Sequence, residues 1–323
     1  MTATQTTTSE APSFAELFDS IARNVEQVIQ GKSDVVALAM MCLLSEGHLL
    51  IEDVPGVGKT SLAKALANSI DCTWKRVQFT PDLLPSDVVG VTVWNRGTDR
   101  FEFRPGPVFA NIVLGDEINR ASPKTQSSLL EAMEERQVTV DGTSYRLEPP
   151  FMVIATQNPA DHEGTYPLPE NQLDRFLMRI SIGYPDRQSE IEILDVHAGL
   201  TTLPTVRAVA TATQVESMVQ AVRTVHVAPA IKSYLVDLAD ASRRHPGVHL
   251  GMSPRATLSL LRASRARAAA LGRNYVIPDD VKALAGPVLA HRFVLSPDAQ
   301  LQGADGRAVV QDVLASVPVP TTR

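Results

Sequence analysis

Apolar residues in the first part of the chain follow two different spacings. They recur every three or four positions over 14–30 and 33–44, which predicts two helices. Short apolar runs that end in polar residues predict strands at 49–52, 75–79, 112–114, 151–155 and 178–182. Further helical patterns lie between these runs, at 59–69, 123–136 and 170–176. Because strands that alternate with helices form parallel sheets, we expect an α/β domain over 14–186.

Two other stretches alternate between apolar and polar residues. Runs over 89–94 and 100–104 flank the turn-forming segment 95–99, and the stretch 137–147 turns at Asp141 and Gly142. An Asp-Gly pair between alternating residues is a strong hairpin signal. The sequence therefore predicts two β-hairpins inserted into the α/β domain.

The strand pattern stops after residue 184, and only helical spacing follows. The predicted helices cover 187–198, 213–223, 229–244, 254–271 and 278–289. We therefore expect an all-helical domain over 187–300, with a boundary near residue 186. Residues 1–13 are rich in Thr and Ser and predict a disordered N-terminal arm. The pattern leaves open whether the expected C-terminal tail, 301–323, packs against the rest of the chain.

Composition narrows the possible classes of function. The 323 residues carry a formal net charge of −6, so the chain has no overall basic field that would hold a nucleic-acid backbone. The two cysteines, Cys42 and Cys72, have no CxxC spacing and fit a reducing cytosol. The N-terminal residues show no signal-peptide pattern, and no apolar run is long enough to span a bilayer. We expect a cytoplasmic protein without a membrane segment.

The stretch 49–61 carries the strongest chemical signal. An apolar run leads into a turn rich in Pro and Gly, and a helical pattern begins at Lys59. This is the strand, loop and helix order of a phosphate-binding P-loop, with predicted contacts from Val54, Pro55, Gly56, Val57, Gly58, Lys59, Thr60 and Ser61. Lys59 would reach the β- and γ-phosphates, and the Thr60 hydroxyl would bind Mg²⁺. One position departs from the motif, because Asp53 stands where its first glycine is expected.

Two more strand ends carry polar groups suited to phosphoryl transfer. The predicted strand 112–114 runs into Asp116 and Glu117, and the side chains of adjacent residues diverge. Asp116 is the candidate Mg²⁺ ligand, and Glu117 is the candidate general base for the attacking water. Asn158 follows the strand 151–155 and could contact the γ-phosphate or position that water. The alternatives are a solvated strand end for the acidic pair and a turn-forming Asn-Pro for Asn158.

The order and spacing of several motifs closely resemble the AAA+ ATPases, in particular the MoxR family. These motifs lie at 53–60, 114–120, 155–159, 173–176 and 253–256. The resemblance implies an AAA+ P-loop NTPase with a parallel αβα core, two β-hairpin inserts and an all-helical lid. It also implies a homo-oligomeric ring, most commonly a hexamer, that binds ATP and Mg²⁺.

The resemblance assigns roles that spacing alone does not. Asn158 is similar to sensor 1, and Arg255 is similar to sensor 2, on a lid that closes over the nucleotide. Arg175 resembles the arginine finger, which would reach the γ-phosphate of the neighbouring subunit, and Arg179 is the second choice for this role. The alternative for either arginine is a structural salt bridge. Ile29 and Gly31 precede the P-loop strand, where related proteins surround the adenine.

The resemblance also implies what hydrolysis drives. MoxR-like proteins resemble chaperones that remodel or activate partner proteins, often partners with von Willebrand factor A domains, and this is our leading hypothesis. A magnesium-chelatase-like subunit that drives metal insertion is the alternative. A nucleic-acid motor is less favoured, because the net charge is acidic and the hairpin region 137–148 carries only one basic residue, Arg146. We therefore expect no nucleic-acid partner.

Overall fold

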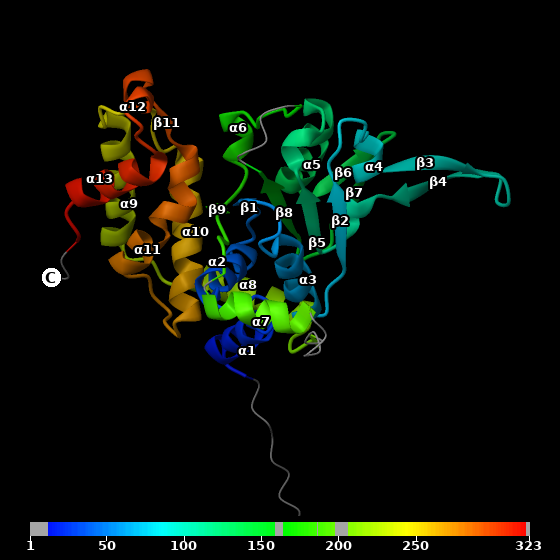
Figure 1. The fold of residues 1–323 in the computed structure, drawn as a ribbon, viewed down its shortest axis with the longest axis horizontal. Helices are drawn as coiled ribbons and strands as arrows, with labels where there is room; N and C mark the ends of the chain where they lie inside the picture. The colour runs from blue at the N-terminus through cyan, green and yellow to red at the C-terminus, as the bar shows by residue number, and fades with distance from the viewer. Residues whose placement is uncertain (1–11, 159–163, 186, 198–205, 321–323) are drawn as a thin grey trace, which may run out of the picture.

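The computed structural model describes residues 12–158, 164–185, 187–197 and 206–320. Residues 1–11 of the expected N-terminal arm and the expected boundary at residue 186 lie outside these ranges. The described residues form an α/β core that carries projecting hairpins and packs against a helical lid (Figure 1). Within these ranges, no helix is long and apolar enough to cross a membrane.

A five-stranded parallel sheet forms the centre of the core. Its order is β2-β5-β8-β1-β9, and the strands are β1 (Leu49–Glu52), β2 (Trp74–Gln78), β5 (Ile112–Asp116), β8 (Met152–Gln157) and β9 (Met178–Ile180). This confirms the predicted parallel sheet, with small shifts at the strand ends. β1 leads into the P-loop and lies between β8 and β9. The carboxyl ends of all these strands meet at one edge, where open parallel sheets bind their ligands.

Helices cover both faces of this sheet. One apolar core includes residues of α1 (Phe14–Glu26), α2 (Ser33–Leu44) and α3 (Lys59–Ser69), and the second core includes residues of α5 (Pro123–Glu135). Along β5, Ile112 and Leu114 belong to the first core and Val113 to the second, because successive strand side chains point to opposite faces. β5 is therefore buried on both sides, which explains its continuous apolar run.

Both predicted hairpins form. β3 (Gly90–Asn95) pairs with β4 (Arg100–Pro105), and β6 (Gln137–Val140) pairs with β7 (Thr143–Arg146), each in antiparallel register. The first hairpin extends well away from the core (Figure 1). The second turns at Asp141 and Gly142, whose φ angles of 49° and 78° suit an Asp-Gly hairpin turn. The sequence pattern missed α4 (Pro85–Val89), a short helix that ends where β3 begins.

The C-terminal part of the chain is mostly helical and includes the lid. Its helices are α7 (Arg187–His197), α8 (Ala212–Thr224), α9 (Pro229–Arg244), α10 (Pro254–Ala270), α11 (Pro278–Leu289), α12 (Pro297–Leu301) and α13 (Gly306–Ser316), with a 3-10 turn, η3 (Ala290–Arg292). The expectation of an all-helical domain needs one correction, because β10 (Val248–Leu250) and β11 (Val294–Leu295) pair in antiparallel register. These strands are too short to produce an alternating pattern in the sequence.

The expected tail, 301–323, belongs to the lid over much of its length. Helix α12 ends at residue 301, and α13 then packs against α9 and α11. Val309, Val310 and Val313 of α13 are buried in this contact. Full burial of an apolar side chain of this kind stabilises a fold by about 1.5–3 kcal/mol, which explains why the segment docks.

Lid and core share one apolar interior. The core cluster that contains α1, α2 and α3 also contains residues of α8, α10 and α11. Helix α10 packs against α1, α2 and α8. The lid is therefore seated against the outer helices of the core, beside α1 and α2 in Figure 1.

A short helix before β9 differs from the sequence pattern. α6 (Glu170–Leu173) ends three residues earlier than the predicted segment 170–176. The carbonyl oxygens of Asp174 and Phe176 accept hydrogen bonds from Arg292 of the lid, at 3.2 and 2.8 Å. A side chain distant in the sequence thus satisfies two backbone carbonyl groups of this segment, which local spacing does not reveal.

Candidate functional site

A loop with two glycines in the left-handed backbone region connects β1 to α3. Gly56 and Gly58 have φ angles of 86° and 95°, which residues with a Cβ rarely adopt. Gly58 stands at the N-cap of α3, so the unpaired amides at the start of the helix border the loop. Such amides, together with the helix dipole, bind phosphate oxygens. The structure thus has the strand, loop and helix geometry that the sequence predicts.

Asp53, in place of the first glycine, anchors the start of this loop. Its Oδ2 atom accepts hydrogen bonds from the Gly183 amide (2.6 Å) and the Ser181 hydroxyl (2.9 Å), and its Oδ1 atom accepts one from the Val54 amide. Burial tends to raise the pKa of Asp53, but these hydrogen bonds outweigh burial and lower it below its ordinary value. Lys59 Nζ donates to the Asp53 carbonyl oxygen at 2.6 Å. Asp53 therefore holds the loop against the segment that follows β9.

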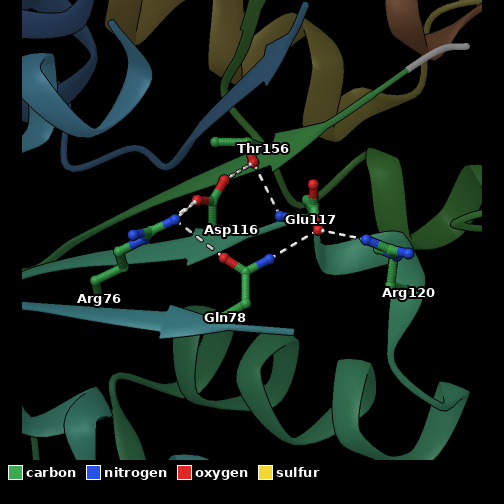
Figure 2. Close-up of polar contacts among 6 residues, drawn as sticks. All are labelled: Arg76, Gln78, Asp116, Glu117, Arg120 and Thr156. Carbon is green, nitrogen blue, oxygen red and sulfur yellow. Dashed lines mark hydrogen bonds and ion pairs between the residues drawn. The ribbon is translucent and has the colours of Figure 1, made fainter. Parts of the chain in front are cut away.

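Figure 2 shows how Asp116 is held at the end of β5. Its Oδ2 atom lies 2.6 Å from Nη2 of Arg76 on the neighbouring strand β2. Its Oδ1 atom accepts a hydrogen bond of 2.5 Å from the hydroxyl of Thr156 on β8. Thr156 is fully buried and also accepts a hydrogen bond from the Glu117 amide, at 2.9 Å. The hydroxyl thus joins the end of β5 to the end of β8 and fixes the orientation of the Asp116 carboxylate.

Glu117 is directed away from Asp116 by an unusual backbone conformation. Its φ of 55° lies in the left-handed region, which costs about 1–3 kcal/mol for a residue with a side chain. Its Oε2 atom accepts hydrogen bonds from Gln78 Nε2 (2.7 Å) and Arg120 Nη1 (3.0 Å), as Figure 2 shows. The adjacent carboxylates therefore have separate partners, consistent with separate tasks.

The P-loop and the ends of β2, β5 and β8 enclose a cavity of about 370 Å³. Its lining contains many of the residues predicted to bind nucleotide and metal, and consists of Pro55, Gly56, Gly58, Lys59, Thr60, Ser61, Arg76, Gln78, Asp116, Glu117 and Asn158. Of the other described residues predicted to bind nucleotide, Val54 and Val57 belong to the loop but not to this lining. A Cβ atom at Gly58 would come within 3.5 Å of Ile29 Cδ1, so Ile29 lies against the loop. Gly31 also lies outside the lining, two positions further along the chain.

Arg175 and Arg255 line a different cavity, of about 380 Å³. There Glu134 contacts both, with Arg175 Nη2 3.2 Å from its Oε2 atom and Arg255 paired with its Oε1 atom. Arg255 was expected where the lid closes over the nucleotide, and in this chain it lines the second cavity and not the P-loop cavity. Arg179, the second choice for the finger, forms an ion pair with Glu52 at 3.1 Å.

Sequence reasoning did not single out Arg76, Gln78 and Thr156. Arg76 and Gln78 occupy alternate positions of β2, so both side chains lie on the same face of the strand. Gln78 stands opposite Asp116 in the sheet register. The sequence signal for Arg76 and Gln78 was a pair of polar residues at alternate positions near a strand end. This signal becomes informative only when β2 is known to lie beside β5.

Comparisons with known proteins identify the family. Residues 48–178 match the ATPase family associated with various cellular activities (AAA), and residues 240–313 match the AAA lid domain. The chain is 40% identical to Chaperone MoxR1 of Mycobacterium tuberculosis over 305 residues, which cover 92% of this chain and 80% of that protein. The chain belongs to the MoxR family of AAA+ ATPases. This confirms the resemblance drawn from the motifs.

Two further relatives match almost the whole length of this chain. The chain is 48% identical to the uncharacterized protein YeaC of Bacillus subtilis over 307 residues, which cover 95% of this chain and 96% of YeaC. A crystal structure from Cytophaga hutchinsonii, assigned provisionally as an ATPase, is 35% identical and superposes with a TM-score of 0.89. That match covers 95% of this chain and 96% of the other, so core and lid share one arrangement in both.

Membership of an ATPase family implies a bound nucleotide, and the residues of the P-loop cavity fit one. Lys59 supplies a cation whose pKa is lowered by burial, against the opposing effect of Asp116, Asp53 and Glu117. The Thr60 hydroxyl and the Asp116 carboxylate are oxygen donors, which Mg²⁺ prefers. Among the described residues, no group of three or more His, Cys, Asp or Glu side chains is placed to hold a metal. An ion here would therefore depend on nucleotide phosphates and water for its other ligands.

Proposed function

We propose that this MoxR-family chain hydrolyses ATP at the interfaces of a homo-oligomeric ring, with a hexamer as the expected assembly. One observation carries the proposal: the phosphate-binding groups and the arginines Arg175 and Arg255 lie in different cavities of the same chain. Phosphoryl transfer needs positive charge at the γ-phosphate in the transition state. A second copy would supply that charge, so hydrolysis would take place between two subunits.

The residues of the P-loop cavity would divide the remaining work. Lys59 would hold the β- and γ-phosphates, with the Thr60 hydroxyl and Asp116 positioned to hold Mg²⁺. A bound Mg²⁺ would neutralise charge on the phosphates. Glu117 would take the proton of the attacking water, and Asn158 would orient that water. Because Asp116 and Glu117 have separate hydrogen-bond partners, one can hold the metal while the other acts as the base.

Arg175 and Arg255 would act together on the neighbouring subunit. Glu134 contacts both guanidinium groups, so a single carboxylate holds them side by side. An arginine finger contributes about 10³ to 10⁵ in rate in related phosphoryl-transfer enzymes. We assign Arg175 this role and Arg255, the sensor 2 candidate, a second contact from the lid.

The hairpin β3–β4 supports a role in contacting a partner protein. Trp94 and Phe101 form an edge-to-face pair with ring centroids 5.0 Å apart, and they are 48% and 71% exposed. Closer to the core, Phe103 stacks on Tyr145 of the second hairpin at 4.1 Å. Exposed aromatic residues on a rigid element are typical of contact surfaces, and the stack would make the hairpins move together.

We propose that the ring uses hydrolysis to remodel or activate partner proteins in the cytoplasm. The relative named Chaperone MoxR1 supports this class of function. As partner we propose a protein with a von Willebrand factor A domain, as the resemblance to MoxR proteins implies. Rigid-body motion between core and lid would be transmitted to the partner through the paired hairpins.

Subunit mixing tests hydrolysis at the interface. Arg175→Ala removes the proposed finger, and Glu117→Gln removes the proposed base, so each variant alone should bind ATP and hydrolyse it poorly. In mixed rings, the intact pocket of an Arg175→Ala subunit can meet the intact finger of a Glu117→Gln subunit. We expect the mixture to exceed the sum of the separate ATPase rates. A mixture that stays at that sum, although mass measurements show mixed assemblies, contradicts the proposal.

Capture by the Glu117→Gln variant tests the partner. This variant should hold ATP without cleaving it and so retain its client, and wild-type protein in ADP serves as the control. We expect a protein with a von Willebrand factor A domain in the ATP sample, and the purified partner should stimulate wild-type ATPase activity. Stimulation by DNA instead would favour a nucleic-acid motor, and a partner that inserts metal into a cofactor would favour the magnesium-chelatase-like alternative.

A further inference from the structure

A buried arginine of the lid donates hydrogen bonds to the chain segment that carries Arg175. Arg292 lies in η3, is 8% exposed, and extends into the segment between α6 and β9. Its Nη2 atom donates to the carbonyl oxygens of Asp174 (3.2 Å) and Phe176 (2.8 Å). Its Nε atom lies 2.9 Å from Asp174 Oδ1. The residues on both sides of Arg175 are therefore held by one side chain that follows them by more than 100 positions.

The backbone around Arg175 makes no regular helix or strand hydrogen bonds. α6 ends at residue 173, and the amides of Arg175 and Phe176 make only turn hydrogen bonds, of 3.2 and 3.1 Å. His291, next to Arg292, places Nε2 3.1 Å from the Phe176 carbonyl oxygen. Two adjacent lid residues thus hold the backbone beside Arg175, together with the side chain of Phe176, which is fully buried in the core.

The arrangement of Arg292 favours a geometric role over a purely stabilising one. Burial lowers the pKa of Arg292 to about 10, so the guanidinium remains charged at neutral pH although it is buried. Removing such a group from water is costly, and well-packed apolar residues often stabilise a protein as well or better. A planar guanidinium, however, donates in fixed directions and can set the positions of several acceptors at once.

The lid also meets the side chain of Arg175. The Arg175 guanidinium contacts Glu134, whose other oxygen pairs with Arg255 of α10. Lid residues thus border Arg175 twice, at its backbone through η3 and at its side chain through the shared carboxylate. A shift of the lid relative to the core therefore acts on both the backbone and the side-chain contacts of Arg175.

We infer that Arg292 is a positioning residue, which sets the Arg175 finger from the lid and passes lid movement of one subunit to the ATP site of the next. The inference rests on the proposed function, because Arg175 must act across a subunit interface. Loss of Arg292 in one subunit should therefore impair ATP hydrolysis in the neighbouring subunit, which receives the finger. The P-loop cavity of the altered subunit itself should stay intact.

Subunit mixing with Arg292→Lys tests this direction. Lysine keeps the charge but loses the planar set of donors. A displacement of about 1 Å at a catalytic group costs about 10²-fold in rate, so we expect a fall of that order in ATPase turnover. Affinity of the variant for a fluorescent ADP should stay within about twofold of wild type, since the P-loop cavity is unchanged.

The decisive readout is recovery in mixed rings. Equimolar Arg292→Lys and Glu117→Gln subunits, mixed at random, give about one interface in four with both an intact pocket and a well-placed finger. We expect activity well above the sum of the separate rates. A change that only loosened the fold would not be rescued by a neighbour that itself cannot hydrolyse ATP. Asp174→Asn keeps Arg292 but removes its carboxylate partner. This variant should also lose turnover alone and recover in mixed rings, and it remains informative if Arg292→Lys folds poorly.

Controls separate failure of this inference from failure of the proposed function. If Arg175→Ala recovers with Glu117→Gln but neither Arg292→Lys nor Asp174→Asn does, the positioning role is wrong and the interface site stands. If Arg175→Ala also fails to recover in verified mixed rings, the interface site itself is wrong. Arg244→Lys, an exposed lid arginine on α9, should match wild type in all assays.

Discussion

Arg76 Nη2 lies 2.6 Å from Asp116 Oδ2, so the carboxylate predicted to bind Mg²⁺ is paired with a cation of the protein itself. The two side chains lie on adjacent strands and differ in exposure, with the arginine 48% and the aspartate 13% exposed. An ion pair this open contributes about 0.2–1 kcal/mol. A metal at Asp116 would therefore displace a weakly held arginine at a small cost.

Replacement of Arg76 by alanine should make Mg²⁺ binding easier. Without the competing cation, we expect the Mg²⁺ concentration that half-saturates Mg²⁺-dependent ADP binding to fall by about twofold to fivefold, as expected for up to about 1 kcal/mol. Fluorescence titrations of ADP at varied Mg²⁺ measure this directly. Arg76→Lys keeps a cation and should stay close to wild type. An equal or higher Mg²⁺ requirement in Arg76→Ala would show that the arginine does not compete.

Asp53→Asn should destabilise the protein in a pH-dependent manner. The charged carboxylate accepts hydrogen bonds from Ser181 and Gly183, and bonds to a charged group contribute about 1.5–3 kcal/mol. The pKa of Asp53 is lower in the folded state than in the unfolded chain, so this stabilisation is fully present above about pH 4 and disappears as the pH falls through the folded value. In urea unfolding at pH 7, the free energy of unfolding of Asp53→Asn should be about 2 kcal/mol lower than that of wild type. This gap between the two proteins should narrow below pH 4. A gap that widens in acid would contradict the assignment.

His48 should make folding sensitive to mild acid. Its Nδ1 atom accepts a hydrogen bond from the Val153 amide (2.9 Å), and its Nε2 atom lies 3.1 Å from the Met133 carbonyl oxygen, so the ring is neutral in the fold. Burial, together with nearby Arg136, lowers its pKa to about 3. Because the unfolded chain gains the proton near pH 6.5, stability present above that value is lost as the pH falls. Between pH 7 and pH 5, the titration of His48 alone should lower the free energy of unfolding by about 2 kcal/mol.

Two variants isolate this effect of His48. His48→Gln keeps a polar side chain without the titration, so its free energy of unfolding should depend less steeply on pH between 7 and 5. The exposed His249→Gln is the matched control and should retain the wild-type slope. Parallel slopes for wild type and His48→Gln in urea unfolding would rule out the assignment.

The stack of Phe103 on Tyr145 should couple the two hairpins energetically. Aromatic pairs contribute about 0.5–1.5 kcal/mol beyond their buried area, and this pair has ring centroids 4.1 Å apart. A double-mutant cycle with Phe103→Leu and Tyr145→Leu should therefore give an interaction energy of about 1 kcal/mol in unfolding experiments. Val91→Ala lies on the opposite face of the hairpin, so its effect should add to that of Tyr145→Leu. An additive result for both pairs would mean that the hairpins are not linked by this stack.

Local spacing was sufficient to predict the parallel sheet and the strand, loop and helix order of the P-loop. The P-loop, Asp116, Glu117 and Asn158 each follow a strand, and the carboxyl ends of parallel strands meet at one edge. These groups converge in one cavity because β5, β8 and β1 are neighbours in the sheet. The same reasoning predicted the hairpin at Asp141 and Gly142, because that turn depends on adjacent residues only.

The tertiary structure decided which arginine meets which carboxylate. Arg76 pairs with Asp116 because β2 lies beside β5, and strand order is not encoded in either segment alone. Arg255 contacts Glu134, and Arg292 holds the chain around Arg175, because the lid packs against α1 and α2. A long charged side chain contacts the surface against which its helix packs. Its partners therefore follow from packing between segments that are distant in the sequence. Periodicity along the chain carries no information about such contacts.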